Sequence, residues 1–457
     1  MAPGSTTPPR PPREGGGARS GPGDPGGGAA GGPRLSVLQG SALALSATAP
    51  WYSIMVTAPL IAALVGSGTA VVYLLAAIPA ALVAAGMSAN DRRDPHKGSV
   101  YTWVRRALPR TGWFAGFCLA ATGVIATSGM AYVAADLLAP AAPAWARVGL
   151  AALLTAVATA IDVGSIRAMA VLQYLAAVTG VAATLTCLMM VMDGSVSLRP
   201  TIGSPLDWFH GVLLAVFAYW GFDAIYALTE QAETGAPQRV AVSTMIALMV
   251  FFTVGGTACS AADASPVVSN PVVRIAVVTS AVMSLGSTLV PTARGVEAMA
   301  EAGEVPSWAA ILSEARWSTL AVATVSVFWS GLLLVSEGLF NDTIEALSVL
   351  VGVYFTVSSL IAALHAASVR ERAEQWASAV LMGVITLSVT AQMFTVGYSD
   401  TSLAGVGGAG LIVAGLCLVG AIAALVCTGR GARADDTRGS APDEEGCRAR
   451  RRAGRHD

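Results

Sequence analysis

Long apolar runs separated by short polar loops dominate the pattern along the chain. A helix needs about 20 predominantly apolar residues to cross a bilayer, whereas a membrane β-barrel shows short alternating segments, which do not occur here. We therefore predict an all-α polytopic membrane protein with twelve transmembrane helices. The predicted spans are residues 37–64, 69–88, 112–138, 142–161, 169–192, 208–230, 240–262, 272–298, 317–336, 343–368, 377–397 and 403–427.

The two ends of the chain lack this pattern. Residues 1–34 are rich in Pro, Gly and Arg, and residues 428–457 are polar with mixed charge. Such segments bury too little apolar surface to order themselves, so we predict two disordered cytoplasmic tails around one membrane domain, residues 35–427. The first apolar run is too long for the apolar core of a signal peptide.

Composition agrees with a membrane protein. The chain is 54% hydrophobic and 12% charged, with a mean hydropathy of +0.64, whereas soluble domains carry about 25% charged residues. The six cysteines and four histidines are scattered without the spacing of a metal site, so we expect no metal and no cofactor. The net charge of −1 points to no particular partner, and we expect no nucleic acid.

The basic residues are distributed unequally between the two sets of loops. With the N-terminus inside, the outer loops hold only Arg147, Arg199 and Arg274. Positive charge gathers on the cytoplasmic side of membrane proteins, so this asymmetry predicts that both termini are cytoplasmic. The inner loops hold Arg92, Arg93, Lys97, Arg105, Arg106, Arg110, Arg167, Arg239, Arg294, Arg316, Arg370 and Arg372.

The first ten spans divide into two blocks of similar length, at residues 37–192 and 208–368. Five crossings are an odd number, so the second block enters the membrane from the opposite side. Two such blocks form an inverted repeat, an arrangement common among secondary transporters. We predict a 5+5 inverted repeat followed by two extra C-terminal helices.

The first span of the first block carries Pro50 at mid-membrane. Proline cannot donate to the helical ladder and disfavours helix at the preceding residue, but it fits the first turn of a new helix. We predict that the helix ends near Ser46, unwinds through residues 47–49 and restarts at Pro50. A simple proline kink is the alternative.

The first span of the second block carries Gly221 next to Asp223. A charged side chain near the bilayer centre costs about 2.5–3.5 kcal/mol or more, and unpaired backbone is tolerated there only where it lines a cavity. This combination predicts a helix broken around something polar, near residues 219–223. The alternative is a tight helix contact at Gly221 with Asp223 paired elsewhere.

Two breaks at the same depth favour a zwitterionic ligand. The restarted half of the first helix would direct N–H groups and a positive dipole end at a carboxylate, and the ends of the first halves would direct carbonyls at an ammonium. Small residues at 47, 49, 218 and 221 allow a ligand close to the backbone, and the aromatic residues at 219, 220 and 222 supply a wall or a gate.

Two acidic residues of the sixth span have several interpretations. Asp223 is a gate partner, a contact for a cationic side chain, or a cap on the second half of the helix. Glu230, near the inner end, is a solvated charge at the membrane edge or half of an inner-gate salt bridge with a loop arginine.

Three stretches resemble the amino acid–polyamine–organocation (APC) superfamily of permeases. Residues 97–106 with 112–116 are similar to its "GG-x-Y-x-W" signature, and residues 217–239 are similar to its sixth helix and following loop. Residues 293–306 resemble the "R-x-x-x-x-M-A-x-x-G-x-x-P" end of its eighth helix. The resemblance implies alternating access around a central site between broken helices 1 and 6. By this resemblance the substrate-binding residues are Ser46, Ala47, Thr48, Ala49, Pro50, Phe217, Ala218, Tyr219, Trp220 and Gly221.

The chain departs from this family at two places. The family often has a Gly-Ser-Gly or similar run at the helix 1 break, whereas this chain reads Ser-Ala-Thr-Ala-Pro. Some proton-coupled members of the family place a lysine in helix 5. The fifth span here has none, because Lys97 is the only lysine in the chain. A lysine-based proton switch is therefore absent. Ser287 and Thr288, together with Ser284, are weak candidates for a sodium site, with hydroxyls bonding back to their own helix as the alternative.

The sequence therefore predicts a secondary active transporter of an amino acid or related amine in the cell membrane. Its expected partners are the substrate, a coupling ion (sodium or proton) or a counter-substrate, and the lipid bilayer. A polyamine or organic-cation permease or exchanger, with Asp223 or Asp136 against the second charge, is the runner-up, ahead of a permease-like sensor that does not transport. We expect no enzyme, because the few buried ionisable residues have no histidine near them in sequence.

Overall fold

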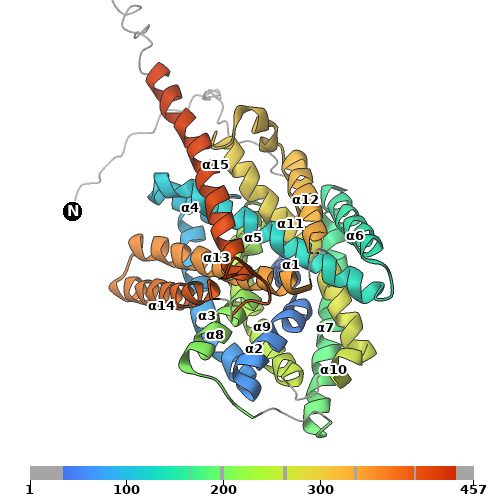
Figure 1. The fold of residues 1–457 in the computed structure, drawn as a ribbon. Coiled ribbons are helices and arrows are strands. Elements are labelled where there is room, and N and C mark those ends of the chain that lie inside the picture. The colour runs from blue at the N-terminus through green and yellow to red at the C-terminus, as the bar shows by residue number, and fades with distance from the viewer. Residues whose placement is uncertain are drawn as a thin grey trace, which may run out of the picture. The chain divides into compact units, whose positions relative to one another are not determined.

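The computed structural model describes residues 34–164, 166–195, 200–260, 265–333, 337–395 and 398–438 (Figure 1). The helices belong to one unit that begins at Leu35. Its first part contains α1 (Val37–Thr48), α2 (Pro50–Val65), the 3-10 helix η1 (Gly66–Gly68), α3 (Thr69–Arg93), α4 (Ser99–Ala107), α5 (Pro109–Leu138), α6 (Ala144–Gly164) and α7 (Ile166–Met192).

The second part continues this almost entirely helical pattern. A two-stranded antiparallel hairpin, in which Ser402 pairs with Gly407, precedes the last helix. The elements are α8 (Pro205–Tyr219), η2 (Phe222–Gln231), α9 (Ala236–Cys259), α10 (Ser265–Ser269), α11 (Pro271–Glu301), η3 (Ser307–Ser313), α12 (Ala315–Leu332), α13 (Glu337–Leu364), α14 (Val369–Met393), β1 (Ser402–Leu403), β2 (Val406–Gly407) and α15 (Gly408–Arg438).

Ten segments of the described chain are long and apolar enough to cross a membrane. The first, Val37–Arg93, joins α1, α2 and α3 in one run, and α12 is not among the ten. The predicted multi-pass, nearly all-helical architecture is therefore confirmed.

Two predicted boundaries differ from those observed. α14 begins at Val369 rather than at 377, because the Ser368 side chain accepts a hydrogen bond from the Glu371 N–H and caps a polar first turn ahead of the apolar run. α15 continues to Arg438, past the predicted domain boundary at 427. The rest of the predicted tails, residues 1–33 and 439–457, lies outside the described residues.

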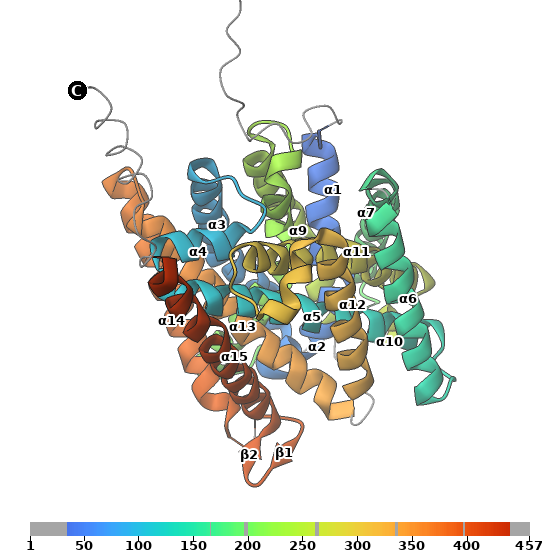
Figure 2. The ribbon, with the colours of Figure 1, turned by 90° about the horizontal axis from the view of Figure 1, so that it is seen from above.

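Burial separates the helices of the centre from those of the rim. The apolar window of Pro205–Gln231, which covers α8 and η2, is 100% buried, whereas that of Ala144–Ile161 in α6 is 17% buried. Figures 1 and 2 agree, because both views place α6 at the edge of the bundle. A segment enclosed on all sides by protein can carry irregular backbone and an acid at membrane depth, because neighbouring helices replace water.

The start of the first helix is tied to the end of the sixth segment. Ser36 caps α1 by accepting from the Gln39 N–H, and Gln39 reaches back to the Ser36 N–H, forming a capping box. The Leu35 N–H donates to the Gln231 carbonyl at 2.8 Å, and the Leu35 carbonyl accepts from the Glu233 N–H at 3.1 Å. The two segments predicted to be broken are therefore joined at this end of the bundle.

Candidate functional site

The first break lies where the sequence predicts it but is narrower. α1 runs on to Thr48, Ala49 alone adopts a left-handed conformation (φ 49°, ψ 57°), and α2 restarts at Pro50. A left-handed residue with a side chain costs about 1–2 kcal/mol. The Ala49 N–H donates to the Ser46 carbonyl at 2.9 Å, so it is not left unpaired at the break. Ala49 is the only residue between the two helices.

The second break is also confirmed. α8 ends at Tyr219, Trp220 is extended with ψ 145°, and Gly221 has φ 115°, a value that favours glycine. From Phe222 the chain continues as the 3-10 helix η2 rather than as α-helix. A 3-10 stretch within a longer helical segment often marks a functional hinge or a strained sequence.

The two breaks lie against each other. A Cβ atom built on Gly221 would lie 2.6 Å from the Thr48 amide nitrogen and 2.7 Å from both Thr48 Cα and the Ala47 carbonyl carbon. Any side chain at this position would separate the two backbones. The tight contact at Gly221 and the broken helix, which are alternatives at the sequence level, therefore occur together.

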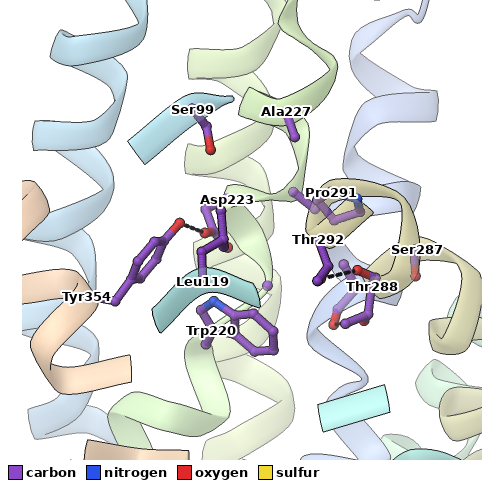
Figure 3. A pocket seen from close by; sticks show the side chains of 13 residues that line it. Ser99, Leu119, Trp220, Asp223, Ala227, Ser287, Thr288, Pro291, Thr292 and Tyr354 are labelled. Atoms are coloured by element: carbon purple, nitrogen blue, oxygen red, sulfur yellow. Dashed lines mark hydrogen bonds between the residues drawn. The ribbon is translucent and has the colours of Figure 1, made fainter. Parts of the chain in front are cut away.

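A small cavity, which we call the central cavity, lies beside this contact (Figure 3). Its volume of about 20 Å³ admits a water molecule. Its walls come from α1, α4, α5, η2, α11 and α13, together with the residues of the second break. The lining residues are Ala47, Ser99, Leu119, Trp220, Gly221, Asp223, Ala224, Ala227, Ser287, Thr288, Pro291, Thr292 and Tyr354.

Asp223 is the only residue with an ionisable carboxylate among the described residues lining this cavity. It is 8% exposed, and it accepts a hydrogen bond from the Tyr354 hydroxyl of α13, as Figure 3 shows. Its partner is therefore a neutral donor, and no lysine or arginine lines the described walls. A buried acid without a cationic partner favours a positively charged ligand beside it.

The cavity also offers a hydrogen-bond donor. The Trp220 indole Nε1 is buried and has no partner among the described residues. The other three predicted positions of this segment, Phe217, Ala218 and Tyr219, do not line the cavity. Tyr219 instead donates to the Tyr73 carbonyl at 3.2 Å and belongs to the core.

The predicted residues of the first break are divided between two cavities. Ala47 faces the cavity with Asp223, whereas Ser46 and Pro50 line a smaller one of about 10 Å³. The Gln173 amide and the Ser280 hydroxyl, which also line this smaller cavity, are buried without partners among the described residues. Thr48 and Ala49 line neither cavity.

The hydroxyls predicted as weak sodium ligands face the end of α1. The Ser284 hydroxyl donates to the Ser46 carbonyl, and Thr288 Oγ1 lies 3.4 Å from the Ala47 carbonyl oxygen. Ser287 Oγ lies 3.3 Å from Ser46 Oγ. The hydroxyls of Ser284 and Ser287 also bond back to carbonyls within α11, as the alternative interpretation predicts.

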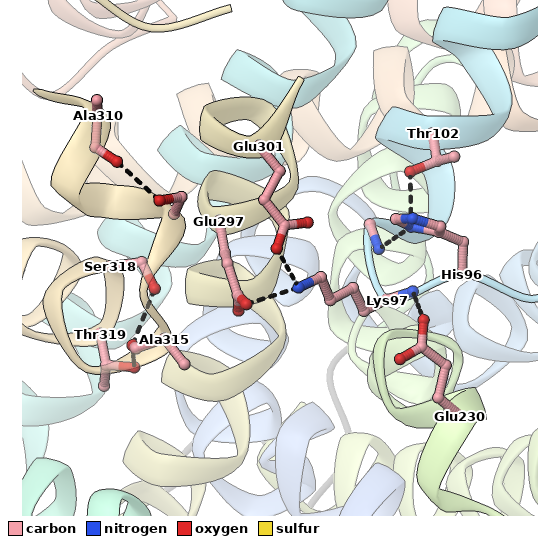
Figure 4. A network of polar contacts seen from close by, with 12 residues as sticks. His96, Lys97, Thr102, Glu230, Glu297, Glu301, Ala310, Ala315, Ser318 and Thr319 are labelled. Carbon is pink, nitrogen blue, oxygen red and sulfur yellow. Dashed lines mark hydrogen bonds and ion pairs between the residues drawn. The ribbon is translucent and has the colours of Figure 1, made fainter. Parts of the chain in front are cut away.

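The C-terminal end of η2 contacts a network around the only lysine in the sequence (Figure 4). Glu230 accepts from the backbone N–H of Lys97 at 3.2 Å, so its partner is not the predicted loop arginine. The Lys97 ammonium lies 2.6 Å from Glu297 and 2.8 Å from Glu301, both on α11. Burial lowers the pKa of Lys97, but the hydrogen bonds and charges of these two glutamates outweigh it and raise the pKa above its ordinary value.

The sequence did not predict seven of the residues that line this cavity: Ser99, Leu119, Ala224, Ala227, Pro291, Thr292 and Tyr354. Leu119, Pro291, Thr292 and Tyr354 come from spans whose inward faces one sequence does not reveal. The spacing 284, 287, 288, 291, 292 on α11 follows one helical face and is a usable signal. Asp136, in contrast, pairs with Arg147 and does not line the cavity.

Comparison with known proteins agrees with this geometry. A sequence profile described as "Amino acid permease" matches residues 35–271. No curated protein sequence gives a significant match.

Solved structures of a manganese transporter from Eremococcus coleocola have a similar fold. Its complex with an aromatic bis-isothiourea substituted compound shares 12% identity over 86% of this chain and 92% of that chain, with a TM-score of 0.53. A single-substitution variant of the same transporter shares 11% identity over the same fractions, also with a TM-score of 0.53.

The profile covers more than half of the chain, the breaks lie where the APC resemblance places them, and the fold is that of membrane transporters. The chain is therefore a multi-pass membrane protein that belongs to the amino acid permease family of the APC superfamily.

Proposed function

We propose that this protein is a secondary active transporter that moves an amino acid or a related amine across the cell membrane by alternating access. The observation that carries the proposal is the contact between the two breaks, with a buried acid and an unpartnered indole N–H beside it. Irregular backbone at membrane depth lines substrate sites in transporters with broken helices.

The substrate ammonium would bind near Asp223 and the last carbonyls of α1. A carboxylate would face the N–H groups of the first turn of α2, which have no partner within their own helix, or the Trp220 indole N–H. With the Trp220 indole as the donor, both ends of an amino acid zwitterion would have a complementary group within one cavity.

An organic cation without a carboxylate is a second candidate substrate. Asp223 alone supplies charge to the described walls, and no basic side chain balances it or attracts a carboxylate. This arrangement favours positive charge more clearly than it favours a zwitterion. Uptake that requires an amine but tolerates loss of the carboxylate would favour this alternative.

We further propose twelve crossings in two inverted blocks, with both termini cytoplasmic. Counting Val37–Arg93 as two crossings and adding α12 to the other nine segments gives this number. Each block, at residues 37–192 and 208–368, then begins with a broken helix. The basic residues of the short loops support the orientation.

The cavity volume of about 20 Å³ corresponds to a contracted state. An amino acid has at least five non-hydrogen atoms, so binding requires the helices around the breaks to separate. Trp220 and the Tyr354–Asp223 hydrogen bond are placed to move in this step. Closure of helices around a small solute is common in such carriers.

Sodium is the coupling ion for which oxygen ligands are at hand. The Ser46 hydroxyl lies 3.3 Å from the Ser287 hydroxyl, and the Ala47 carbonyl oxygen lies 3.4 Å from the Thr288 hydroxyl. The described residues contain no group of three His, Cys, Asp or Glu side chains placed to hold a metal ion.

Uptake into proteoliposomes tests the proposal. Labelled amino acids and amines are supplied with and without sodium or proton gradients, and internal solute is added to detect exchange. We expect accumulation of at least one amine-bearing solute, driven by a gradient or by counterflow. Specific, saturable binding without any flux would instead identify a sensor and overturn the transport assignment.

A further inference from the structure

A larger cavity of about 190 Å³ lies at the opposite end of the bundle from Lys97. It is formed where α2 ends, α8 begins and α13 begins, together with residues that follow α14. None of its lining residues lines the central cavity, and it was not predicted from the sequence.

We call this larger cavity the outer cavity. One of its walls is apolar and the other is polar. One wall is aliphatic and comes entirely from α2, with Leu60, Ala63 and Leu64. The remaining described lining residues are polar, and three of them carry carboxylates. A ligand that satisfies both walls has an apolar part and a polar, positively charged part.

The polar wall is built around a buried contact between three segments. His210 of α8 and Glu345 of α13 are 5% and 7% exposed, and His210 Nε2 lies 2.6 Å from Glu345 Oε2. The Tyr398 hydroxyl donates to the same carboxylate oxygen at 2.8 Å. Burial and the Glu345 carboxylate raise the pKa of Tyr398, so this hydroxyl keeps its proton and remains a donor.

One oxygen of the Glu345 carboxylate is left for a ligand. Both contacts go to Oε2, and Oε1 accepts no hydrogen bond from the described residues. Asp342, in contrast, accepts from the backbone N–H groups of Asp400 and Thr401 and from the Thr401 hydroxyl, so its carboxylate holds the loop.

The charge of the polar wall stays negative under any protonation of its histidine. Asp342, Glu345 and Asp400 are the acids, His210 is the only basic side chain among the described lining residues, and it neutralises at most one of them. Asp400 and Ala63 are exposed, whereas Glu345 is buried, so the cavity leads from the surface to an acid in a poorly solvated position. Such a position strengthens attraction for a cation.

We propose that this outer cavity is a second binding site, specific for a small organic cation with one ammonium group and a short alkyl chain. The ammonium binds Glu345 Oε1, with Asp400 nearby, and the alkyl chain packs on Leu60 and Leu64. An engineered cavity of about 150 Å³ holds benzene, so five or six non-hydrogen atoms fit in this volume. The site requires neither the central cavity nor the transport function proposed above.

The test measures binding of radiolabelled n-butylammonium to the full chain in lipid nanodiscs by equilibrium dialysis. n-Butanol has the same shape without the charge and serves as the competitor. Glu345→Gln removes the charge of the buried acid, and Ala63→Phe fills the cavity from the aliphatic wall. Glu374→Gln on α14 removes an acid elsewhere and is the matched control, and Asp223→Asn reports on the central cavity.

We expect Glu345→Gln to weaken n-butylammonium binding by about tenfold or more, because a charge-assisted contact is lost. We expect Ala63→Phe to weaken it at least as much, because the phenyl ring fills the space of the alkyl chain. Glu374→Gln should bind as the wild type does, Asp223→Asn should keep saturable binding that still depends on Glu345, and n-butanol should not compete. Ala63→Phe keeps the His210–Glu345–Tyr398 contact, so it still tests the site if the Glu345→Gln variant does not fold.

Three results would overturn the outer site. These are no saturable binding to the wild type, wild-type binding by Ala63→Phe, or loss of all saturable binding in Asp223→Asn. If no solute is taken up in proteoliposomes while n-butylammonium binding still depends on Ala63 and Glu345, the transport proposal fails and the outer site stands.

Discussion

The central and outer cavities are built in opposite ways. The central one is small, about 20 Å³, and is defined by two breaks of the backbone with a single acid beside them. The outer one is about 190 Å³ and is defined by side chains of α2, α8, α13 and the residues after α14, away from the breaks, with three acids and a histidine. Size alone would therefore select a different cavity from the one that we propose as the transport site.

The difference indicates how each cavity responds to change. Backbone groups at a break can be re-paired by a ligand and again by water, so the central cavity suits a cycle of opening and closing. The outer cavity is held by side-chain contacts such as Glu345 with His210 and Tyr398, and it needs no such movement to admit a small cation.

Adding one methyl group at the contact of the breaks should have the largest effect. Gly221→Ala places a Cβ about 2.6 Å from the Thr48 amide nitrogen at a φ of 115°. We expect uptake to fall by at least about 100-fold, because a misplacement of about 1 Å is enough for a loss of that order. Gly149→Ala on α6, where a Cβ meets no atom within 4 Å, is the matched control and should transport normally. Wild-type uptake by Gly221→Ala would contradict the role of the contact.

Removing the charge of the central acid should have the next largest effect. Asp223→Asn keeps the size of the side chain but removes its attraction for an ammonium, so we expect uptake of amines to fall by about ten- to 100-fold. Asp136→Asn removes an acid that pairs with Arg147 away from the cavity and should have little effect. Equal uptake by both variants would move the cation contact out of the central cavity.

Removing a hydroxyl beside α1 should affect only ion dependence. Thr288→Val keeps the shape but loses the oxygen near the Ala47 carbonyl. If sodium is the coupling ion, the sodium concentration for half-maximal uptake should rise by about tenfold, since one ligand oxygen is lost. Ser318→Ala on α12, which also lacks one hydroxyl, is the control. Unchanged sodium dependence would place the ion elsewhere.

Disrupting the ion pairs of Lys97 should give the smallest effect, on stability rather than on transport. The pKa of Lys97 is raised in the folded state, so its contribution is fully present below about 10.5 and is lost as the pH rises through the folded value. We expect Lys97→Met to lower Tm by about 1–3 °C, as for a partly exposed ion pair. The difference from the wild type should stay constant between pH 6 and 9 and shrink above 10.5. A difference that changes near pH 7 would implicate another group.

The breaks were predictable because proline and glycine act on the backbone at their own position. Pro50 removes a donor and Gly221 permits a positive φ, and neither effect needs knowledge of a neighbour. The extent of the first break was not predictable, because the tightness of the left-handed turn at Ala49 depends on its packing.

The side chains that complete both cavities were not predictable from one sequence. Tyr354 reaches Asp223 across 131 residues, and Glu345 meets His210 across 135. No local pattern marks such pairs, so the four histidines look merely scattered in the sequence. Only packing of the helices brings these residues together.

A cryo-EM structure of the full chain in nanodiscs, with the solute that gives the highest uptake, tests the central claim most directly. We predict density for the solute between the two breaks, against Ala47, Trp220 and Asp223, with the cavity enlarged beyond its present 20 Å³. A solute bound elsewhere, with Gly221 still against Thr48 and the central cavity unchanged, would contradict the assignment of this cavity as the transport site.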